Sequence, residues 1–377
     1  MPEICHVTSA HPRYDIRIFV KECQSLVQNN YNVNLIVADN LADENYKLDA
    51  SNSIAIFDVG KELGRFNRMW KTPKKIYHKV LELRPDIIHF HDPELMLIAL
   101  KLQKKGFKVI YDVHEDLPKQ IQNKHWLPVY SRNIMARIAI ILETFVAKRI
   151  SGIVAATPII ATRFCKYNSN TVTVCNYPLL REMDISSVTT DFGLRRNAIC
   201  YIGSISKPRG ILPLLASLEL SKINLELAGN ISSDLSYEEL KQIPGFNYSN
   251  YRGIIDRNAI IKLLGEVKVG MVTLLPTPSY IESLPIKMFE YMLAGIPVVA
   301  SNFSLWRDIV EKYKCGILVD PTNPDEIAKV CTHLVANDKL AEVMGKNGKN
   351  AVIEHFNWKK EEIKLINFYK VIFYEKS

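Results

Sequence analysis

Short apolar segments alternate with helical segments along the whole chain, and this alternation constrains the fold more than any other feature. In the first half, strands are predicted at residues 4–8, 33–37, 54–59, 86–90, 108–111, 153–155 and 171–174. Helices are predicted between most of these strands, at residues 15–29, 73–83, 93–104 and 132–149. Such alternation is typical of a doubly wound parallel sheet with helices on both faces.

A second alternating series begins in the middle of the chain. Its strands are predicted at residues 198–202, 224–228, 246–251, 267–275, 298–300 and 316–319. Two such series predict an α/β protein with two Rossmann-like domains that face each other across a cleft. We expect the domains to span residues 1–178 and 179–357, and we expect a last amphipathic helix at about 358–377.

Length and composition agree with a two-domain globular protein. The chain has 377 residues, of which 47% are hydrophobic and 23% are charged, as expected for a soluble protein with a substantial core. The longest apolar stretch, 134–147, contains Arg137 and Glu143 and is too short and too charged to span a bilayer. The N-terminus lacks the pattern of a secretory signal, and the seven scattered cysteines predict reduced thiols and a cytoplasmic location.

The positive charge is unevenly distributed. Residues 1–178 carry 24 Lys and Arg against 17 Asp and Glu, whereas residues 179–377 carry 24 against 23. The surplus of +7 in the first half is compatible with nucleic acid, an anionic membrane surface or an anionic acceptor. No recognisable nucleic-acid-binding motif accompanies it, so we expect no nucleic-acid partner.

Two carboxylates eight positions apart, Glu282 and Glu290, flank the predicted start of a helix. Pro285 fits the first turn of this helix, and Gly295 followed by Pro297 ends it. The helix begins beyond the carboxyl end of the preceding strand, where free N–H groups and the helix dipole form an anion site, typically for phosphate. One carboxylate on each side of a phosphate site suits a nucleotide sugar, because carboxylates accept hydrogen bonds from ribose and sugar hydroxyls.

This segment resembles the E-x7-E signature of the retaining glycosyltransferases of family 4, which have the GT-B fold. The resemblance implies that Glu290 holds the nucleotide ribose and that Glu282 contacts the donor sugar. It also implies that the backbone of Leu284, Pro285, Ile286 and Lys287 meets the diphosphate and the sugar. In proteins with the GT-B fold the last helix crosses back to the first domain, and we expect the same of the helix at 358–377.

The turn after the strand at 198–202 is the second expected donor site. The family usually carries G-R-x-x-x-x-K-G here, with both basic residues on the diphosphate. This chain has Gly203 followed by Ser204 in place of the arginine, and Arg209 in place of the lysine. Arginine suits the task because its guanidinium binds phosphate oxygens in pairs, and Lys207 is close enough to replace the missing charge.

The nucleotide base is expected near Arg252, at the end of another strand. The family reads the base here largely through backbone groups, which leave no side-chain pattern in the sequence. We expect a UDP-sugar rather than a GDP-sugar as donor, and we expect no further cofactor.

Histidines at two strand ends are the main candidates in the first half. His114 ends the strand at 108–111, and the resemblance implies that it contacts the donor sugar and helps to organise the reacting centre. His89 and His91 share one face of another strand, with Asp92 and Glu94 beyond, so a transition-metal site is one interpretation. The spacing matches no established metal motif, and we expect side chains lining the cleft and no metal.

Two basic segments of the first half are candidates for the acceptor. After the first strand, Arg13 and Arg17 are predicted to bind an acceptor phosphate, with His11 beside them. The segment 61–75 interleaves six lysines and arginines with Phe66, Met69 and Trp70, a pattern that fits an anionic bilayer surface or a merely solvated loop. A lipid-diphosphate-linked saccharide is therefore the expected acceptor, and the protein is expected to lie peripherally on the inner face of the cell membrane.

Together these features predict a glycosyltransferase that moves a sugar from a nucleotide-diphosphate donor to an acceptor hydroxyl. Retention of anomeric configuration, catalysis without metal and a role in bacterial surface-polysaccharide synthesis are implied by the resemblance alone. Three alternatives remain open at this point. The chain can be a nucleotide-sugar epimerase on the same fold, a nucleotide-sugar-binding protein without turnover, or an RNA-binding protein.

Overall fold

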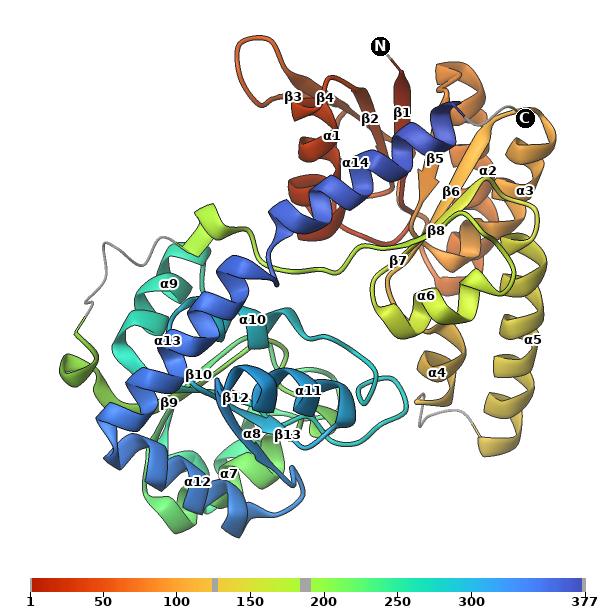
Figure 1. Ribbon diagram of the computed structural model, residues 1–377. Helices are drawn as coiled ribbons and strands as arrows, with labels where there is room; N and C mark the ends of the chain where they lie inside the picture. The colour runs from red at the N-terminus through yellow and green to blue at the C-terminus, as the bar shows by residue number, and fades with distance from the viewer. Residues whose placement is uncertain (1, 124–127, 184–190, 375–377) are drawn as a thin grey trace. The chain divides into compact units, whose positions relative to one another are not determined.

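The chain divides into two units, which consist of Met1–Asn176 with Lys359–Ser377 and of Tyr177–Trp358 (Figure 1). The sequence-based boundary lies after residue 178, and the structural boundary lies after residue 176. The computed structural model describes residues 2–123, 128–183 and 191–374. No helix among these residues has the length and hydropathy needed to cross a membrane.

The first unit is built on an eight-stranded sheet with the order β3-β4-β2-β1-β5-β6-β7-β8. Its strands are β1 (Glu3–Val7), β2 (Asn32–Val37), β3 (Glu44–Lys47), β4 (Ser53–Asp58), β5 (Ile87–Phe90), β6 (Lys108–Val113), β7 (Gly152–Ala155) and β8 (Thr171–Thr173). All neighbouring pairs are parallel except β3 with β4. The edge strand β3 was not predicted, because its sequence Glu-Asn-Tyr-Lys has only one apolar side chain.

Helices cover both faces of this sheet. They are η1 (Ile16–Cys23), α1 (Gln24–Gln28), α2 (Arg65–Leu83), η2 (Pro93–Leu95), α3 (Met96–Lys104), α4 (Leu117–Gln122), α5 (Val129–Ala147), α6 (Pro158–Cys165) and α14 (Trp358–Tyr374). The helix predicted at 15–29 starts with π-type turns in η1, where the carboxylate of Asp15 accepts hydrogen bonds from two backbone N–H groups. Helix α2 starts eight residues earlier than predicted and keeps Pro73 in its interior.

The last helix, α14, packs with the first unit (Figure 1). The hydroxyl of Tyr369 lies 2.6 Å from the Nδ1 atom of His89 on β5. Lys108 donates hydrogen bonds from its Nζ atom to the carbonyl oxygens of Ile372 and Phe373, which satisfies acceptors at the C-terminal end of the helix. Residues from both ends of the chain thus belong to the first unit and pack together in it.

The second unit contains a six-stranded sheet with the order β11-β10-β9-β12-β13-β14, in which all pairs are parallel. Its strands are β9 (Arg196–Ile202), β10 (Asn224–Ala228), β11 (Ser249–Tyr251), β12 (Val267–Val272), β13 (Val298–Ser301) and β14 (Gly316–Val319). Its main helices are α7 (Ile211–Ser221), α8 (Tyr237–Lys241), α9 (Arg257–Glu266), α10 (Ile286–Leu293), α11 (Ser304–Tyr313), α12 (Pro324–Ala336) and α13 (Asp338–Glu354). Short 3-10 turns complete it at Leu180–Met183, Phe192–Leu194, Lys207–Arg209 and Pro244–Tyr248.

The two sheets confirm the predicted fold class of two Rossmann-like α/β domains. The central strands of each unit, such as β5 and β7 in the first and β12 and β13 in the second, are buried on both faces, as expected where helices cover a parallel sheet. The carboxyl edge of such a sheet is where ligands bind.

Candidate functional site

In the second unit, helix α10 starts where the sequence predicted an anion site. Pro285 precedes its first turn, and no side chain caps its N-terminus. Met288, Phe289, Tyr291 and Met292 are buried on the inner face of the helix. The N–H of Met288 already donates to the carbonyl oxygen of Pro285, and the N–H groups before it stand at a helix start, where anionic ligands bind.

Two cations meet beside Gly203, at the carboxyl end of β9. A Cβ atom placed on Gly203 would lie 3.3 Å from the Nζ atom of Lys287 and 3.7 Å from the Nη1 atom of Arg209. Lys287 is 6% exposed, and its Nζ atom has no hydrogen-bond partner. The amino group lies 3.6 Å from the centre of the Tyr201 ring. Glycine at 203 leaves room for a ligand to approach both cations.

This arrangement is unfavourable for Lys287 in the absence of a ligand. Burial, and then the neighbouring charge of Arg209, hold the pKa of the Lys287 amino group well below its ordinary value. A buried donor without a partner costs about 1–3 kcal/mol of stability. An anion between Lys287 and Arg209 would remove both penalties, which makes this place a candidate site for phosphate groups.

The turn that carries Arg209 is fixed by a close backbone contact. Gly210 has φ 74°, and a Cβ atom at this position would lie 1.7 Å from the carbonyl oxygen of Thr273. Lys207 is exposed, and its backbone N–H donates to Asp234. The carbonyl oxygen of Ser204 accepts a hydrogen bond from the hydroxyl of Tyr201. Arg209, rather than Lys207, is therefore the cation that accompanies Lys287.

Glu290 lies on α10, three residues after Lys287, and is mostly buried. One of its oxygens lies 2.6 Å from the Nη1 atom of Arg257, which begins α9. Sequence reasoning missed Arg257, and the only local signal was its position shortly after β11. Glu282 is half-buried in the loop between β12 and α10. Trp306 donates a hydrogen bond from its indole to the carbonyl oxygen of the adjacent Ser283 and so holds this loop.

The side chain of Arg252, near which the nucleotide base is expected, is held in an ion pair. Its Nε atom lies 2.7 Å from a carboxylate oxygen of Glu226, and the other oxygen of Glu226 binds Arg196. Because Glu226 is buried on β10, the two arginines neutralise a charge within the sheet. The guanidinium of Arg252 is thus engaged in an ion pair within the second unit.

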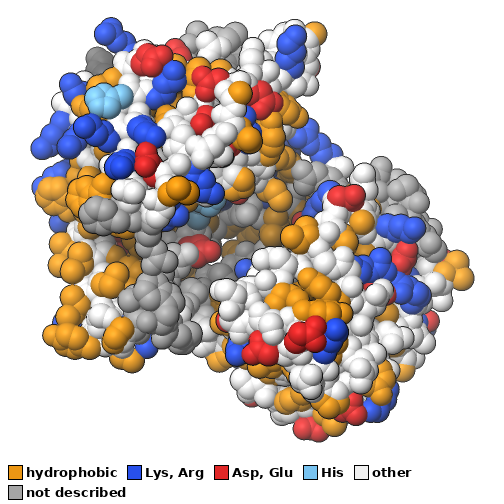
Figure 2. All heavy atoms as spheres, turned by 180° about the vertical axis from the view of Figure 1, so that it is seen from behind, with side chains coloured by type: hydrophobic (Ala, Val, Ile, Leu, Met, Phe, Trp, Pro, Cys, Tyr) orange, Lys and Arg blue, Asp and Glu red, His pale blue; other side chains and the backbone are white. Residues whose placement is uncertain are grey.

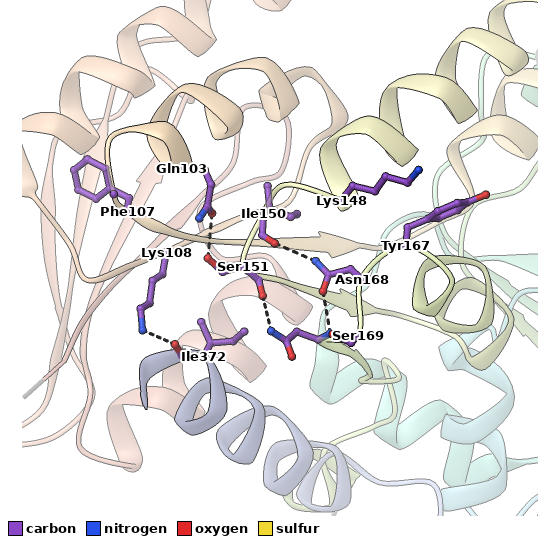
Figure 3. Close-up of a pocket in the computed structure, with 12 residues that line it drawn as sticks. Gln103, Phe107, Lys108, Lys148, Ile150, Ser151, Tyr167, Asn168, Ser169 and Ile372 are labelled. Atoms are coloured by element: carbon purple, nitrogen blue, oxygen red, sulfur yellow. Dashed lines mark hydrogen bonds between the residues drawn. The ribbon is translucent and has the colours of Figure 1, made fainter. Parts of the chain in front are cut away.

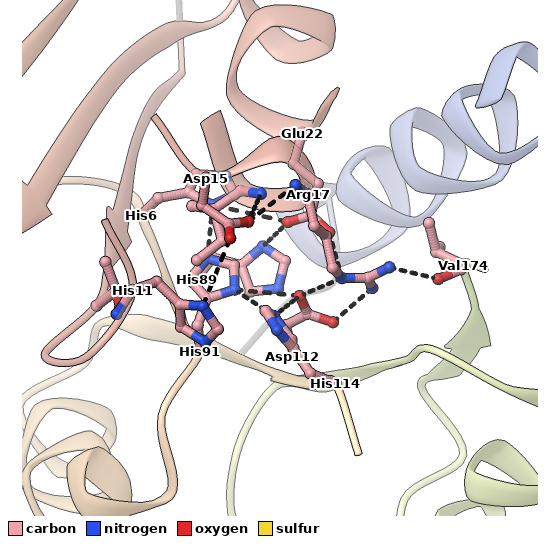
Figure 4. A network of polar contacts seen from close by, with 12 residues as sticks. His6, His11, Asp15, Arg17, Glu22, His89, His91, Asp112, His114 and Val174 are labelled. Atoms are coloured by element: carbon pink, nitrogen blue, oxygen red, sulfur yellow. Dashed lines mark hydrogen bonds and ion pairs between the residues drawn. The ribbon is translucent and has the colours of Figure 1, made fainter. Parts of the chain in front are cut away.

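In the first unit, His114 follows β6 at the carboxyl edge of the sheet (Figure 4). Its Nε2 atom lies 2.7 Å from a carboxylate oxygen of Asp112, which is fully buried. Arg17 donates hydrogen bonds from Nε and Nη2 to both oxygens of Asp112, at 2.8 and 2.7 Å. Burial by itself would raise the pKa of the Asp112 carboxyl. The charges of Arg17 and His114 outweigh this effect and bring the pKa well below its ordinary value. Asp112 therefore remains a carboxylate and fixes the orientation of His114.

A chain of buried polar groups leads inward from Asp112 (Figure 4). His91 lies 3.1 Å from Asp112 through Nδ1 and 3.0 Å from the Nδ1 atom of His6 through Nε2. The hydroxyl of Tyr369 lies 3.2 Å from His6 and 2.6 Å from His89. Burial lowers the pKa of all three histidines, so they are neutral imidazoles at pH 7.

Asp92 and Glu94, the carboxylates of the metal interpretation, belong to neither group of described residues that could hold a metal. Asp92 accepts hydrogen bonds from the hydroxyl of Thr8 and the N–H of Ser9. Among the described residues, two groups have ligand atoms within 4.8 Å of one another and so could hold a metal: His6, Glu22, His89 and His91, and His91, Asp112 and His114. Nitrogen and oxygen donors of this kind suit a transition metal.

The predicted acceptor role of Arg13 and Arg17 is corrected by their contacts. Arg13 is buried, and its guanidinium binds both oxygens of Asp39 and also Glu44. Arg17 is buried against Asp112, as described above, and donates to the carbonyl oxygen of Val174. Charges this well paired hold the loop after β1 in place and are not available for an acceptor phosphate.

His11 remains a candidate on the acceptor side. Its ring centre lies 4.9 Å from that of His114. Burial by itself would lower the pKa of His11. Contacts with Asp15 and Asp92 outweigh this effect and raise the pKa above its ordinary value. The raised pKa favours the protonated form of His11, which would add positive charge to this edge of the sheet.

Two basic residues of the segment 61–75 are held in ion pairs. Lys75 pairs with Glu62 at 2.8 Å, and Arg68 pairs with Glu94 at 3.3 Å. The side chains of Arg65 and Phe66 lie outside the described residues. Among the described side chains of this segment, Met69 and Trp70 are exposed.

A cavity of about 430 Å³ opens at the opposite, amino-terminal edge of the first sheet (Figure 3). Its polar side chains serve the fold. Asn168 donates to the carbonyl oxygens of Ala147 and Ile150, and Ser151 donates to the side chain of Gln103. Because ligands of α/β sheets bind at the carboxyl edge, this cavity is not the candidate site.

Family models match both halves of the chain. "Glycosyltransferase Family 4" matches residues 18–176, and "Glycosyl transferases group 1" matches residues 187–351. An uncharacterized glycosyltransferase of Methanocaldococcus jannaschii is 30% identical over 191 residues, which cover 46% of this chain and 44% of that protein. The alignment with this relative thus spans less than half of either protein.

Solved structures agree over almost the full length. Sucrose-phosphate synthase from Thermosynechococcus elongatus has a TM-score of 0.77 at 16% identity and covers 99% of both chains. Anabaena HepE, solved with UDP and glucose, has a TM-score of 0.71 at 14% identity and covers 98% of this chain and 100% of that one. These proteins are GT-B glycosyltransferases. The chain therefore has the GT-B fold, and its two halves are similar to glycosyltransferases of family 4 and of group 1.

Proposed function

We propose that this protein transfers a sugar from a nucleotide-diphosphate donor to an acceptor hydroxyl, with retention and without a metal. The observation that carries the proposal is the pair of cations, Lys287 and Arg209, beside Gly203 and the uncapped start of α10. In this proposal they bind the diphosphate, while Glu290 holds the ribose and Glu282 contacts the sugar. The solved relative that contains UDP and glucose supports a UDP-sugar as donor.

The chemistry follows from where charge develops. As the bond from the sugar to the diphosphate breaks, negative charge accumulates on the leaving phosphate. Preorganised cations and N–H groups stabilise that charge without reorganisation, which is usually the largest single contribution to such catalysis. We propose that the leaving diphosphate accepts the acceptor proton and that His114, oriented by Asp112, contacts the donor sugar.

The acceptor is proposed from chemistry and analogy. A lipid-diphosphate-linked saccharide would bring an anionic group to the positively charged first unit, and surface-polysaccharide synthesis is the corresponding pathway class. The function is tested by incubating the protein with UDP-sugars and GDP-sugars, with and without acceptor saccharides. Release of the nucleoside diphosphate only when acceptor is present supports transfer, whereas binding without release contradicts it.

Replacing Glu290 by glutamine is expected to weaken donor binding about 10- to 100-fold, because a hydrogen bond to a charged group contributes about 1.5–3 kcal/mol. Calorimetric titration with UDP measures the effect. Glu311→Gln, at an exposed position on the next helix, is the matched control and should bind as the wild type does. Unchanged affinity in a folded Glu290→Gln variant would remove this residue from the ribose.

Transfer is expected to persist after dialysis against EDTA, because Lys287, Arg209 and the start of α10 supply the positive charge that a metal would otherwise provide. The rate before and after dialysis is the measurement. Loss of transfer that Mn²⁺ or Mg²⁺ restores would contradict the proposal. It would point instead to the donor groups around His91, where the structure brings histidines and carboxylates together.

A further inference from the structure

Helix α5 exposes an unusual number of apolar side chains. Its inner face packs on the first unit through Ala136, Ala139, Val146 and Ala147. On the outer side, large apolar residues follow each other at helical spacing and are 40–79% exposed: Tyr130, Ile134, Met135, Ile138, Ile141 and Phe145. We call these six residues the outer face of α5. Figure 2 shows hydrophobic side chains gathered at the lower left, over this helix.

An outer face of this kind needs an explanation. The solvent side of a surface helix normally carries charged and polar residues. Single exposed apolar residues are common, but a contiguous group marks a binding surface. Since the inner face of α5 already packs on the protein, the outer face is free for a partner.

The charges around this face are all positive in the described part of the helix and its C-terminal turn. Arg137, Lys148 and Arg149 are exposed. The guanidinium of Arg149 lies 3.6 Å from the centre of the Phe145 ring. The single acid of the helix, Glu143, is buried and paired with Arg163 at 2.6 Å.

Neighbouring helices continue the pattern. Helix α3 packs against both α5 and α2, so the three form one layer on one face of the sheet (Figure 1). On α3, Leu97 is exposed, as are Lys101 and Lys104. On α2, Trp70 is 61% exposed, beside Lys71.

We propose that the outer face of α5 inserts shallowly into an anionic lipid surface, with the helix lying in the plane of the membrane interface. A helix of 19 residues is about 28 Å long, and helices with an apolar face and basic flanks bind in this way. Lysines and arginines on α3 and α2 add attraction to anionic headgroups. A second copy of the chain is a poor occupant, because two such faces would bring positive charges together.

This surface deepens the proposed function, since it would hold the enzyme where a lipid-linked acceptor lies. The chain passes from β6, which carries His114 at its end, through α4 to α5. A helix that connects parallel strands runs antiparallel to them, so α5 begins at the carboxyl edge of the sheet, where His114 lies. Insertion of α5 would therefore place the membrane surface next to the candidate reacting edge.

The test uses the full chain and vesicles of phosphatidylcholine, with and without about a third of phosphatidylglycerol. The wild type should co-sediment with the anionic vesicles at low salt and be released in part at high salt, where charges are screened within a few ångströms. The double variant Ile138→Ser/Ile141→Ser should lower the partition coefficient about tenfold or more, because two apolar side chains no longer enter the lipid. The control Ile254→Ser/Ile353→Ser, at exposed positions in the second unit, should bind as the wild type does.

A second readout reports insertion directly. In Ile141→Trp, tryptophan emission should shift to shorter wavelength on anionic vesicles and be quenched by brominated lipid chains. Failure of the wild type to bind anionic vesicles at low salt would overturn the proposal, as would equal binding by the Ile138/Ile141 variant. So would a concentration-dependent dimer, seen by light scattering, that this variant abolishes. UDP binding, measured in parallel without vesicles, tests the proposed function separately.

Discussion

Replacing Lys287 by methionine is expected to stabilise the free protein while greatly weakening donor binding and transfer. Methionine has a similar length, fits irregular spaces and makes favourable contacts with aromatic rings such as that of Tyr201. The variant removes a buried amino group that has no hydrogen-bond partner. Stability should rise by about 1–3 kcal/mol, which corresponds to an increase in Tm of about 2–12 °C for a domain of this size.

The effect of Lys287→Met on stability should depend on pH in a defined direction. The pKa of this amino group is lowered in the folded protein, so the unfolded chain binds more protons at pH values between the folded and the unfolded pKa. The stability of the wild type therefore rises with pH up to the ordinary lysine pKa. The advantage of the variant should be largest near neutral pH and shrink as the pH approaches about 10.

Activity should respond to Lys287→Met in the opposite sense. Loss of one preorganised group that stabilises transition-state charge typically costs about 10²- to 10³-fold in kcat. Thermal unfolding with and without UDP, together with kcat/KM, measures both effects. A variant that is less stable than the wild type, or that keeps full UDP-induced stabilisation, would show that Lys287 serves the fold and not the ligand.

Replacing Arg209 by alanine is expected to lower kcat/KM about 10²- to 10³-fold with little effect on folding. The guanidinium of Arg209 stands beside Lys287, and the turn that carries it is fixed by Gly210. Lys207→Ala is the matched control, because Lys207 lies in the same turn but is exposed. Its kcat/KM should stay within about fivefold of the wild type.

The opposite pattern would be equally informative. If Lys207→Ala abolished transfer and Arg209→Ala had no effect, Lys207 would be the phosphate-binding residue, despite its exposed position in the free protein. The two variants should be compared for UDP affinity as well as turnover. An interaction made only in the transition state lowers kcat without changing that affinity.

The elements around the donor site were predictable because their signals are local. Pro285 and Gly295 mark the start and end of α10, and both act through their own backbone conformation. Five of the six strands of the second unit were recognisable as short apolar runs between helical segments, whereas the strand predicted at 246–251 is a 3-10 turn up to Tyr248 and only the polar β11 after it. Edge strand β3 was not recognisable, since it is polar and only its pairing with β4 reveals it.

The roles of individual charges were not predictable in the same way. Arg13 and Arg17 were expected to bind phosphate, but their partners Asp39 and Asp112 lie far away in the sequence and are brought close by the fold. The sequence placed Lys287 at the donor site through its backbone. That its amino group is buried beside Arg209 without a partner depends on packing between α10 and the end of β9.

Helix α5 illustrates the same limit for apolar residues. An apolar run predicts a core helix when the partner surfaces are unknown, and the run 134–147 was excluded only as a membrane span. The structure shows that one side of the helix, including Ile138 and Ile141, is left uncovered. Burial is a property of the tertiary arrangement, so the sequence alone identifies the helix but not its free face.

The most direct test of the account is the difference in binding free energy between UDP and uridine. Calorimetry should measure this difference in the wild type and in the double variant Lys287→Met/Arg209→Ala. The same measurement with GDP and guanosine should be made in parallel. The account predicts that the wild type binds the preferred diphosphate at least about 100-fold more tightly than its nucleoside, because charged hydrogen bonds contribute about 1.5–3 kcal/mol each. In the double variant this ratio should fall to within about threefold. A ratio that is unchanged in a folded double variant would contradict the assignment of Lys287 and Arg209 to the donor diphosphate.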